Sequence, residues 1–215
     1  MEMDEELKAR LRQAYNLKAG ERDARDIPDW RREQRDKFAA LLLQEGKQTF
    51  LELGAGTGID GRYFQELGLD VLCTDLSPEM VRFCRAKGLK ARVMDNTHFD
   101  LPPASFDAVY AMNSLLHLPK KDLPAVLQNI QTVLKPDGLF FMGVYGGIET
   151  EGIWEEDDYE PKRFFAFYTD EELKQILSQF FDIEDFTVTK NVGTGDDPHH
   201  QAAVLRKIPY CTLSD

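Results

Sequence analysis

Residues 50–58 read Phe-Leu-Glu-Leu-Gly-Ala-Gly-Thr-Gly, an apolar run that reaches an acidic residue and then has glycine at every second position. The pattern predicts a strand that runs into a nucleotide-binding loop. Glycines there supply positive φ angles, let a ligand reach the backbone and let the next helix pack closely. An NAD or FAD fingerprint would place its third glycine three residues after Gly56, but that residue is Ile59. The spacing therefore argues against a dinucleotide.

Three further stretches predict strands that end in polar side chains, and these ends are Asp75, Asp95 and Asn113. Asp75 follows the glycine loop by roughly 20 residues, where doubly wound folds place the acid that binds a ribose. The carboxyl ends of parallel strands share one edge of a sheet, so these side chains are expected to gather there. The stretches are 70–75, 90–95 and 106–113.

In order and spacing, these motifs resemble the class I S-adenosylmethionine-dependent methyltransferases, closely over residues 50–145 and more loosely to Lys207. The glycine loop resembles the first motif of that family, and Asp75 its ribose acid. Asp95 and Asn96 resemble its adenine-binding turn, and residues 134–138 resemble the turn before its fifth strand.

The resemblance implies that S-adenosyl-L-methionine is the cofactor and S-adenosyl-L-homocysteine the product. It implies that the loop backbone holds the methionine end, Asp75 the ribose, Asp95 the adenine amino group and Asn113 the region of the ammonium group. Tyr15 is expected to close over the cofactor from an N-terminal helix, although an aromatic at that spacing is as often part of the core. The expected cofactor-binding residues are Tyr15, Glu52, Gly54, Ala55, Gly56, Gly58, Asp75, Leu76, Asp95, Asn96 and Asn113.

The expected fold class is α/β, with a Rossmann-like doubly wound sheet of seven strands whose last strand is antiparallel. Residues 1–215 are expected to form one methyltransferase domain, with a helical cap over 1–45 and a lid insertion over 146–168 after strand five. Ser77 and Thr169 are expected to cap helices. The other predicted helices are 4–17, 28–44 and 120–134, and the predicted final strands are 182–190 and 201–206.

The amino-acid composition indicates which classes of binding partner to expect. The net charge is −12, and nucleic-acid binding relies on Lys and Arg to neutralise phosphates, so no nucleic-acid partner is expected. The mixed-charge run 31–37 is interpreted as a solvated helix face, with a local nucleic-acid contact as the alternative. The acidic start lacks signal-peptide features and no apolar run approaches the ~20 residues of a membrane span, which predicts no membrane partner and a cytoplasmic location. Three widely spaced cysteines, Cys73, Cys84 and Cys211, indicate neither a disulfide framework nor a metal site.

Residues 146–168 lack a clear periodicity and combine aromatic with acidic side chains. The segment is long for a passive connection, so we interpret it as a lid over the acceptor of the methyl group; the alternative is a surface segment whose aromatics fill the edge of the core. Its acids are expected to be solvated, with recognition of a cationic acceptor as the alternative. The acceptor is expected to be a small molecule. The residues expected to bind it are His117, Tyr145, Phe164, Phe165 and Tyr168.

Methyl transfer by in-line displacement requires an acceptor held near attack distance and kept from water. A base is needed only if the acceptor must lose a proton, and His117 is the candidate for that catalytic role, with a loop-ordering histidine as the alternative. His199 and His200 are interpreted as turn residues, with the same catalytic role as the alternative.

Two other functions stay open for this fold: a protein that binds the cofactor without turnover, and an aminopropyl-type transferase. Only methyl transfer requires a partner for the cofactor carboxylate, because decarboxylated cofactor lacks that group.

Overall fold

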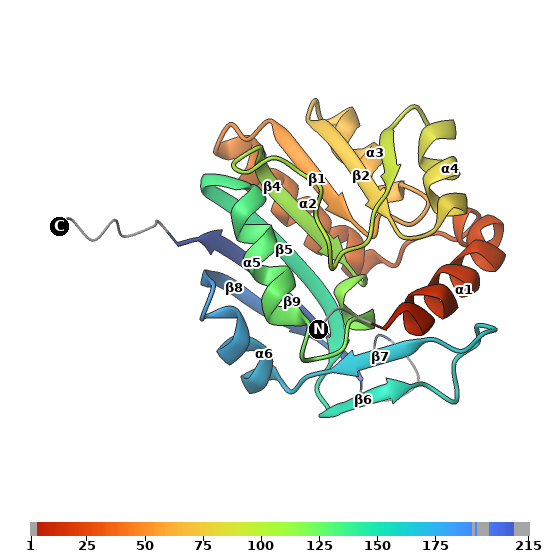
Figure 1. Cartoon of the computed structure of the whole chain (residues 1–215). Helices are drawn as coiled ribbons and strands as arrows, with labels where there is room; N and C mark the ends of the chain where they lie inside the picture. The colour runs from red at the N-terminus through yellow and green to blue at the C-terminus, as the bar shows by residue number, and fades with distance from the viewer. Residues whose placement is uncertain (1–3, 191, 193–197, 209–215) are drawn as a thin grey trace.

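A seven-stranded sheet forms the centre of the computed structural model, which describes residues 4–190, 192 and 198–208 (Figure 1). The strands are β1 (Thr49–Leu53), β2 (Asp70–Asp75), β3 (Lys90–Val93), β4 (Phe106–Met112), β5 (Leu134–Gly146), β8 (Phe181–Thr189) and β9 (His199–Lys207). Their order is β3-β2-β1-β4-β5-β9-β8, and β9 runs antiparallel to both of its neighbours while β1 to β5 pair in parallel. The predicted doubly wound sheet with an antiparallel last strand is confirmed.

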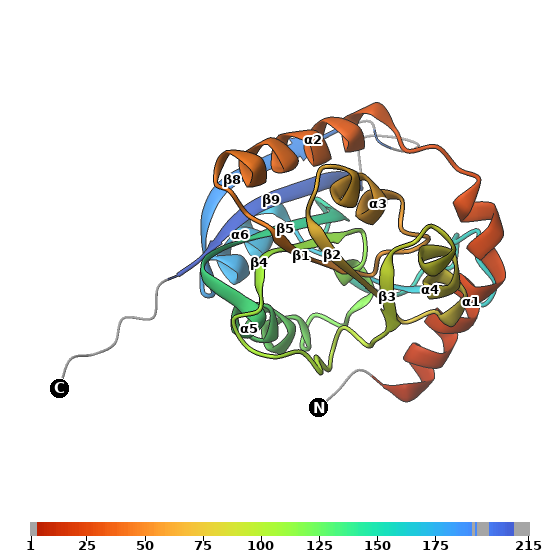
Figure 2. The ribbon, with the colours of Figure 1, turned by 90° about the horizontal axis from the view of Figure 1, so that it is seen from above.

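Helices cover both faces of this sheet. They are α1 (Glu5–Asp23), α2 (Asp29–Gln44), α3 (Ile59–Glu66), α4 (Pro78–Ala86), α5 (Leu123–Val133) and α6 (Asp170–Leu177), with a 3-10 turn η1 (Leu115–His117). Figure 2 shows α2 and α3 on one side of the sheet and α5 on the other. Phe38 of α2 and Phe64 of α3 pack on the rings of Phe50 and Tyr110. These buried aromatics fix the sheet against the helices that flank the glycine loop.

Both predicted helix caps form. The Ser77 hydroxyl accepts a hydrogen bond from the Met80 amide at 3.1 Å, and Pro78 occupies the first helical position. Thr169 and Glu172 form a capping box, in which each side chain accepts from the other residue's backbone amide. The caps set where α4 and α6 begin, and so how the chain leaves β2 and enters the last helix.

The two N-terminal helices pack against different parts of the protein. Phe38 and Leu42 of α2 are fully buried against the sheet, whereas α1 extends to Asp23, beyond its predicted end at residue 17, and lies along α4 (Figure 1). Lys87, the C-cap residue of α4, pairs with Asp23. The longer α1 thereby brings residues up to Arg22 to the carboxyl edge of the sheet.

The segment 146–168 is partly regular, which the sequence did not indicate. It contains β6 (Thr150–Ile153) and β7 (Phe164–Phe167), which pair antiparallel in a separate two-stranded sheet beside α1 (Figure 1). The turn interpretation of His199 and His200 is wrong, because both residues begin β9 and are buried. The predicted loop 191–198 lies largely outside the described residues, as does Cys211.

Candidate cofactor and acceptor site

A cavity of about 470 Å³ opens at the carboxyl edge of the sheet. It lies between the loop after β1, the ends of β2 and β4, helix α1 and the segment around β6 and β7. The predicted residues that line it are Tyr15, Glu52, Gly54, Ala55, Gly56, Asp75, Leu76, Asn96, Asn113, His117, Tyr145 and Phe165. Gly58, Asp95, Phe164 and Tyr168 are not among the lining residues. The structure thus brings together most of the side chains that the motifs singled out.

The three glycines of the loop have positive φ angles but different neighbours. A Cβ on Gly54 would lie 2.3 Å from the Cβ of Ser114, and one on Gly58 would lie 2.6 Å from Leu89 Cδ1. A Cβ on Gly56 would meet no protein atom within 4 Å, although this residue lines the cavity. Gly54 and Gly58 therefore allow close packing, and Gly56 leaves open space where a ligand can reach the backbone.

Asp75 is fixed at the end of β2 by two backbone amides. Its Oδ2 accepts from Gly56 N and its Oδ1 from Ser77 N, both at 2.8 Å. Burial raises the pKa of Asp75 to about 6, although these two hydrogen bonds act in the opposite direction. Each carboxylate oxygen keeps a further lone pair that can accept from a ligand hydroxyl.

Glu52 and Arg31 also line the cavity. Burial and the nearby Asp60 raise the pKa of Glu52 well above its usual range. Arg31 pairs with Asp60, while its Nε is buried with no hydrogen-bond partner among the described residues. Arg35 is also largely buried, with its guanidinium 3.6 Å from the centroid of the Tyr63 ring. The interpretation of 31–37 as a solvated face is therefore wrong at both arginines, because a mixed-charge pattern does not reveal which cations lie over the sheet edge.

Asn113 directly follows β4 with a φ of +54°. Its Oδ1 accepts from Nε2 of His200 at 3.2 Å. Burial lowers the pKa of His200 to about 3, so the imidazole is neutral and can be a donor at Nε2 only if Nδ1 carries no proton. The contact orients the Asn113 amide at the cavity wall.

Tyr15 and His117 are in direct contact. Tyr15 Oη lies 2.7 Å from His117 Nε2, and His117 Nδ1 lies 2.8 Å from the Phe164 carbonyl oxygen. A carbonyl only accepts, so Nδ1 carries the proton and Nε2 accepts from the Tyr15 hydroxyl. Burial and the neighbouring Arg163 lower the pKa of His117 to about 3. The histidine is therefore neutral, and the lone pair on its Nε2 accepts the hydrogen bond from the Tyr15 hydroxyl.

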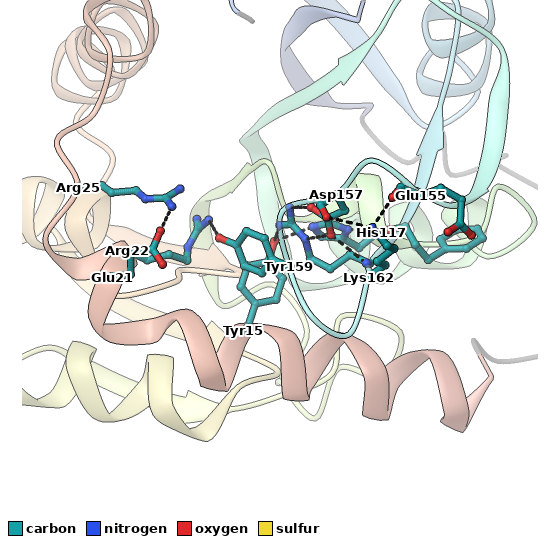
Figure 3. Close-up of polar contacts among 11 residues, drawn as sticks. Tyr15, Glu21, Arg22, Arg25, His117, Glu155, Asp157, Tyr159 and Lys162 are labelled. Carbon is teal, nitrogen blue, oxygen red and sulfur yellow. Dashed lines mark hydrogen bonds and ion pairs between the residues drawn. The ribbon is translucent and has the colours of Figure 1, made fainter. Parts of the chain in front are cut away.

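Arg163 completes this group. It donates to Tyr15 Oη at 2.9 Å, is held by Asp157 at 2.7 Å, and lies 3.5 Å from the centroid of the Tyr159 ring. Figure 3 shows Tyr15, Tyr159, His117 and Asp157 converging above α1. Sequence reasoning missed Arg163 and Tyr159, because nothing in the spacing of 146–168 shows which of its side chains turn inward.

The predicted residues outside the cavity have other contacts. Asp95 pairs with Lys8 of α1 at 2.7 Å and accepts from Thr97 N. Phe164 offers its carbonyl oxygen to His117, and Tyr168 lies beside Lys120. Asp95 and Phe164 thus position α1 and His117, which border the cavity.

The sequence comparisons agree with the motifs. Residues 50–138 match the methyltransferase domain family. The predicted resemblance to the class I S-adenosylmethionine-dependent methyltransferases is confirmed over that part of the chain. A ubiquinone biosynthesis O-methyltransferase of Xanthomonas campestris is 34% identical over 114 residues, which are 50% of this chain and 46% of the relative. A phosphoethanolamine N-methyltransferase 3 of Arabidopsis thaliana is 33% identical over 109 residues, 47% of this chain and 22% of the relative. The chain spans about half the length of the Xanthomonas relative.

Solved structures share the fold over nearly the whole chain. The 1,6-didemethyltoxoflavin-N1-methyltransferase of Burkholderia thailandensis, with its substrate and S-adenosylhomocysteine bound, superposes with a TM-score of 0.72 at 23% identity and covers 96% of this chain and 91% of its own. The DhpI–SAM–HEP complex gives a TM-score of 0.68 at 20% identity, covering 95% and 99%. These likenesses confirm the Rossmann-like methyltransferase fold beyond the matched family segment.

Within the described ranges, the structure has no group of three or more His, Cys, Asp or Glu side chains placed to hold a metal ion. Over the same ranges it has no helix long and apolar enough to cross a bilayer. Cys73 and Cys84 are free and buried.

Proposed function

We propose that this protein transfers a methyl group from S-adenosyl-L-methionine to a small-molecule acceptor by in-line displacement. The observation that carries the proposal is a single cavity lined at one end by the glycine loop and Asp75 and at the other by Tyr15 and His117. When bound, the cofactor supplies a methyl group made electrophilic by its sulfonium. The chain has to bind it, hold the acceptor in line and exclude water.

The cavity residues fit the cofactor. Gly56 leaves open space beside its backbone, and Asp75 presents fixed carboxylate oxygens that suit ribose hydroxyls. We assign the methionine end to Gly54, Ala55, Glu52 and Asn113, and the adenine side to Leu76 and Asn96. Gly58 and Asp95 support this site from outside the lining.

Arg31 supports methyl transfer over an aminopropyl-type reaction. Arg31 lines the cavity, its buried Nε has no partner among the described residues, and its charge acts on Glu52. A guanidinium there suits the cofactor carboxylate, which decarboxylated cofactor lacks.

The cofactor assignment predicts a thermal shift. S-adenosyl-L-homocysteine at about 100 times its dissociation constant should stabilise the fold by about 2.7 kcal/mol, which for this size raises the melting temperature by roughly 5–10 °C. NAD at equal concentration should give no shift. Differential scanning calorimetry with both ligands checks this, and stabilisation by NAD alone would contradict the proposal.

Asp75 predicts a pH dependence of cofactor binding. Its pKa is raised to about 6, so the carboxylate that accepts from ribose is lost as the pH falls through 6. The dissociation constant for S-adenosyl-L-homocysteine should rise about tenfold from pH 7 to pH 5. Asp75→Asn keeps the side-chain shape but does not titrate, so this variant should bind weakly at both pH values. Calorimetric titrations at each pH check this prediction. If the dissociation constant changes equally with pH in wild type and in Asp75→Asn, Asp75 does not bind the ribose.

On the acceptor side, we propose that Tyr15 contacts the substrate and that His117 positions Tyr15. The Tyr15 oxygen donates to His117 and accepts from Arg163, which leaves one lone pair for an O–H or N–H of the acceptor. The predicted base role of His117 would then operate only through the Tyr15 hydroxyl. Tyr145 and Phe165 supply apolar wall beside these groups, with Phe164 and Tyr168 behind them.

We further propose that residues 1–215 work as one domain, with 1–45 as the helical cap and 146–168 as the lid over the acceptor. The net charge of −12 disfavours nucleic acid as a partner. The two buried free thiols suit a reducing compartment such as the cytoplasm.

A cofactor-binding protein without turnover is the second candidate, because the same fold and cofactor cavity would serve it. Incubation with labelled cofactor and a fractionated metabolite extract separates the two. Label transferred to any fraction supports the enzyme, and cofactor binding without transfer to any fraction supports the second candidate.

A further inference from the structure

Arg22 of α1 reaches into the cavity with most of its hydrogen-bonding capacity unused. Its Nη1 donates to the Tyr159 hydroxyl at 3.0 Å (Figure 3). A guanidinium has five N–H donors, and the described residues provide this one hydrogen-bond acceptor and no carboxylate within ion-pair distance. The free donors face the cavity, because Arg22 lines it and none of its nitrogens is a fully buried atom without a partner.

The other arginines of the cavity wall have acidic partners. Arg163 is held by Asp157, Arg31 by Asp60 and Arg25 by Glu21. These three cations are locally balanced before any ligand binds. Within the described part of the chain, Arg22 is thus the lining arginine whose charge has no acidic partner.

Arg22 lies toward the acceptor end. Its guanidinium is 5.3 Å from the centroid of the Tyr15 ring, and its charge acts on His117 as well as on Asp75 at the cofactor end. The charge of Arg31 acts on Glu52 at the methionine end and also on Tyr145. We assign the cofactor carboxylate to Arg31 because its charge acts on Glu52 at the methionine end, which leaves Arg22, beside Tyr15 and Tyr159, for the other substrate.

The acids of the lid do not favour a cation at this point. Of the acidic residues in 146–168, Asp157 and Asp158 line the cavity. Asp157 is committed to Arg163 by two side-chain hydrogen bonds, and Asp158 is exposed. The guanidinium groups of Arg22 and Arg163 each lie 5.3 Å from the centroid of the Tyr15 ring, and the Asp157 carboxylate is paired with Arg163.

We propose that the acceptor carries an anionic group, a carboxylate or a phosphate, which binds the free donors of Arg22 beside Tyr15. This inference rests on the proposed function, since it names the chemistry of the substrate in that same cavity. The planar fork of arginine matches two oxygens of such a group, and the partly buried position strengthens the interaction. The anion would anchor the acceptor while its nucleophilic atom lies near the Tyr15 hydroxyl.

The test uses the full chain loaded with S-adenosyl-L-homocysteine and four small aromatic probes: benzoate, phenyl phosphate, benzamide and benzylammonium. Dissociation constants are measured by ligand-observed NMR. Benzoate or phenyl phosphate should bind at least about tenfold more tightly than the neutral and cationic probes, and the preferred anion identifies carboxylate or phosphate. Arg22→Gln should remove this preference, a loss of about tenfold or more in anion affinity.

Arg12→Gln is the matched control, because Arg12 is an exposed arginine on the same helix and does not line the cavity. It should keep the anion preference. The inference is overturned if wild type shows no preference for the anions, or if the preference survives Arg22→Gln. It is also overturned if Arg22→Gln weakens S-adenosyl-L-homocysteine tenfold and leaves the probes unchanged, since Arg22 would then serve the cofactor. Absence of S-adenosyl-L-homocysteine binding to wild type would instead refute the proposed function, and anion binding measured on the unloaded chain would still test Arg22.

Discussion

Tyr15→Phe should lower the rate of methyl transfer by about 10²–10⁴-fold while changing the affinity for S-adenosyl-L-homocysteine by less than about threefold. Phenylalanine keeps the ring that packs beside His117 and Tyr159 but removes the oxygen that joins His117 and Arg163. The loss should appear in turnover if that oxygen contacts the acceptor, as we propose. Single-turnover labelling of whichever metabolite fraction wild type methylates measures it, beside calorimetry with the cofactor product.

His117→Ala supplies the second half of this test. If His117 acts by holding Tyr15, the two substitutions should not add, and the double variant should be about as slow as Tyr15→Phe alone. The pKa of His117 is lowered to about 3, so the rate should show no inflection near pH 6.5 from a free imidazole. Additive losses, or such an inflection that disappears in His117→Ala, would show that the histidine acts independently of Tyr15.

Gly54→Ala should destabilise the fold by about 2–5 kcal/mol. The residue has a φ of +66°, which costs a side chain about 1–2 kcal/mol, and its new Cβ would lie 2.3 Å from Ser114 Cβ. Overpacking of this kind adds roughly 1–3 kcal/mol. Urea denaturation followed by circular dichroism measures the change in the free energy of unfolding.

Gly56→Ala is the matched control, with a similar φ of +57° but no atom within 4 Å of the new Cβ. It should cost only the backbone term, about 1–2 kcal/mol, and weaken cofactor binding by about tenfold or more, because the Cβ fills the space left for the ligand. Adding Ser114→Gly to Gly54→Ala should restore the part of the unfolding free energy that is lost through the clash with Ser114. Equal destabilisation by the two alanine variants, with no recovery, would show that the contact with Ser114 is unimportant.

The cofactor half of the site was largely predictable from sequence. Local rules govern it: glycines at fixed spacing after an apolar strand, and acids where parallel strands end. Glu52, Gly54, Gly56 and Asp75 meet in the structure for that reason.

The acceptor half was predicted less completely, because it is built from contacts between segments far apart in the chain. Tyr15 meets His117 across 102 positions and Arg163 across 148. No periodicity within α1 shows that Arg22 reaches Tyr159, since that depends on how the helix lies along α4 and the two-stranded sheet. The β6–β7 pair was not predicted because each strand has only four residues and neither alternates between polar and apolar side chains. One strand contains Gly152, and the other is entirely apolar.

The division of the cavity between chain segments has a consequence for how such proteins acquire new substrates. The matched family segment, 50–138, contains the glycine loop, Asp75 and Asn113. Tyr15, Arg22, Tyr159, Arg163 and Phe165 all lie outside it. In the proposed assignment, substrate choice and cofactor use are largely separated along the polypeptide, with His117 inside the segment and Arg31 outside it as the exceptions. Recombination or mutation confined to α1 and the β6–β7 region is then expected to change the molecule that is methylated while leaving the glycine loop and Asp75 unaltered. Chimaeras that exchange only these two segments between fold relatives would be the natural way to move one acceptor preference onto another protein of this architecture.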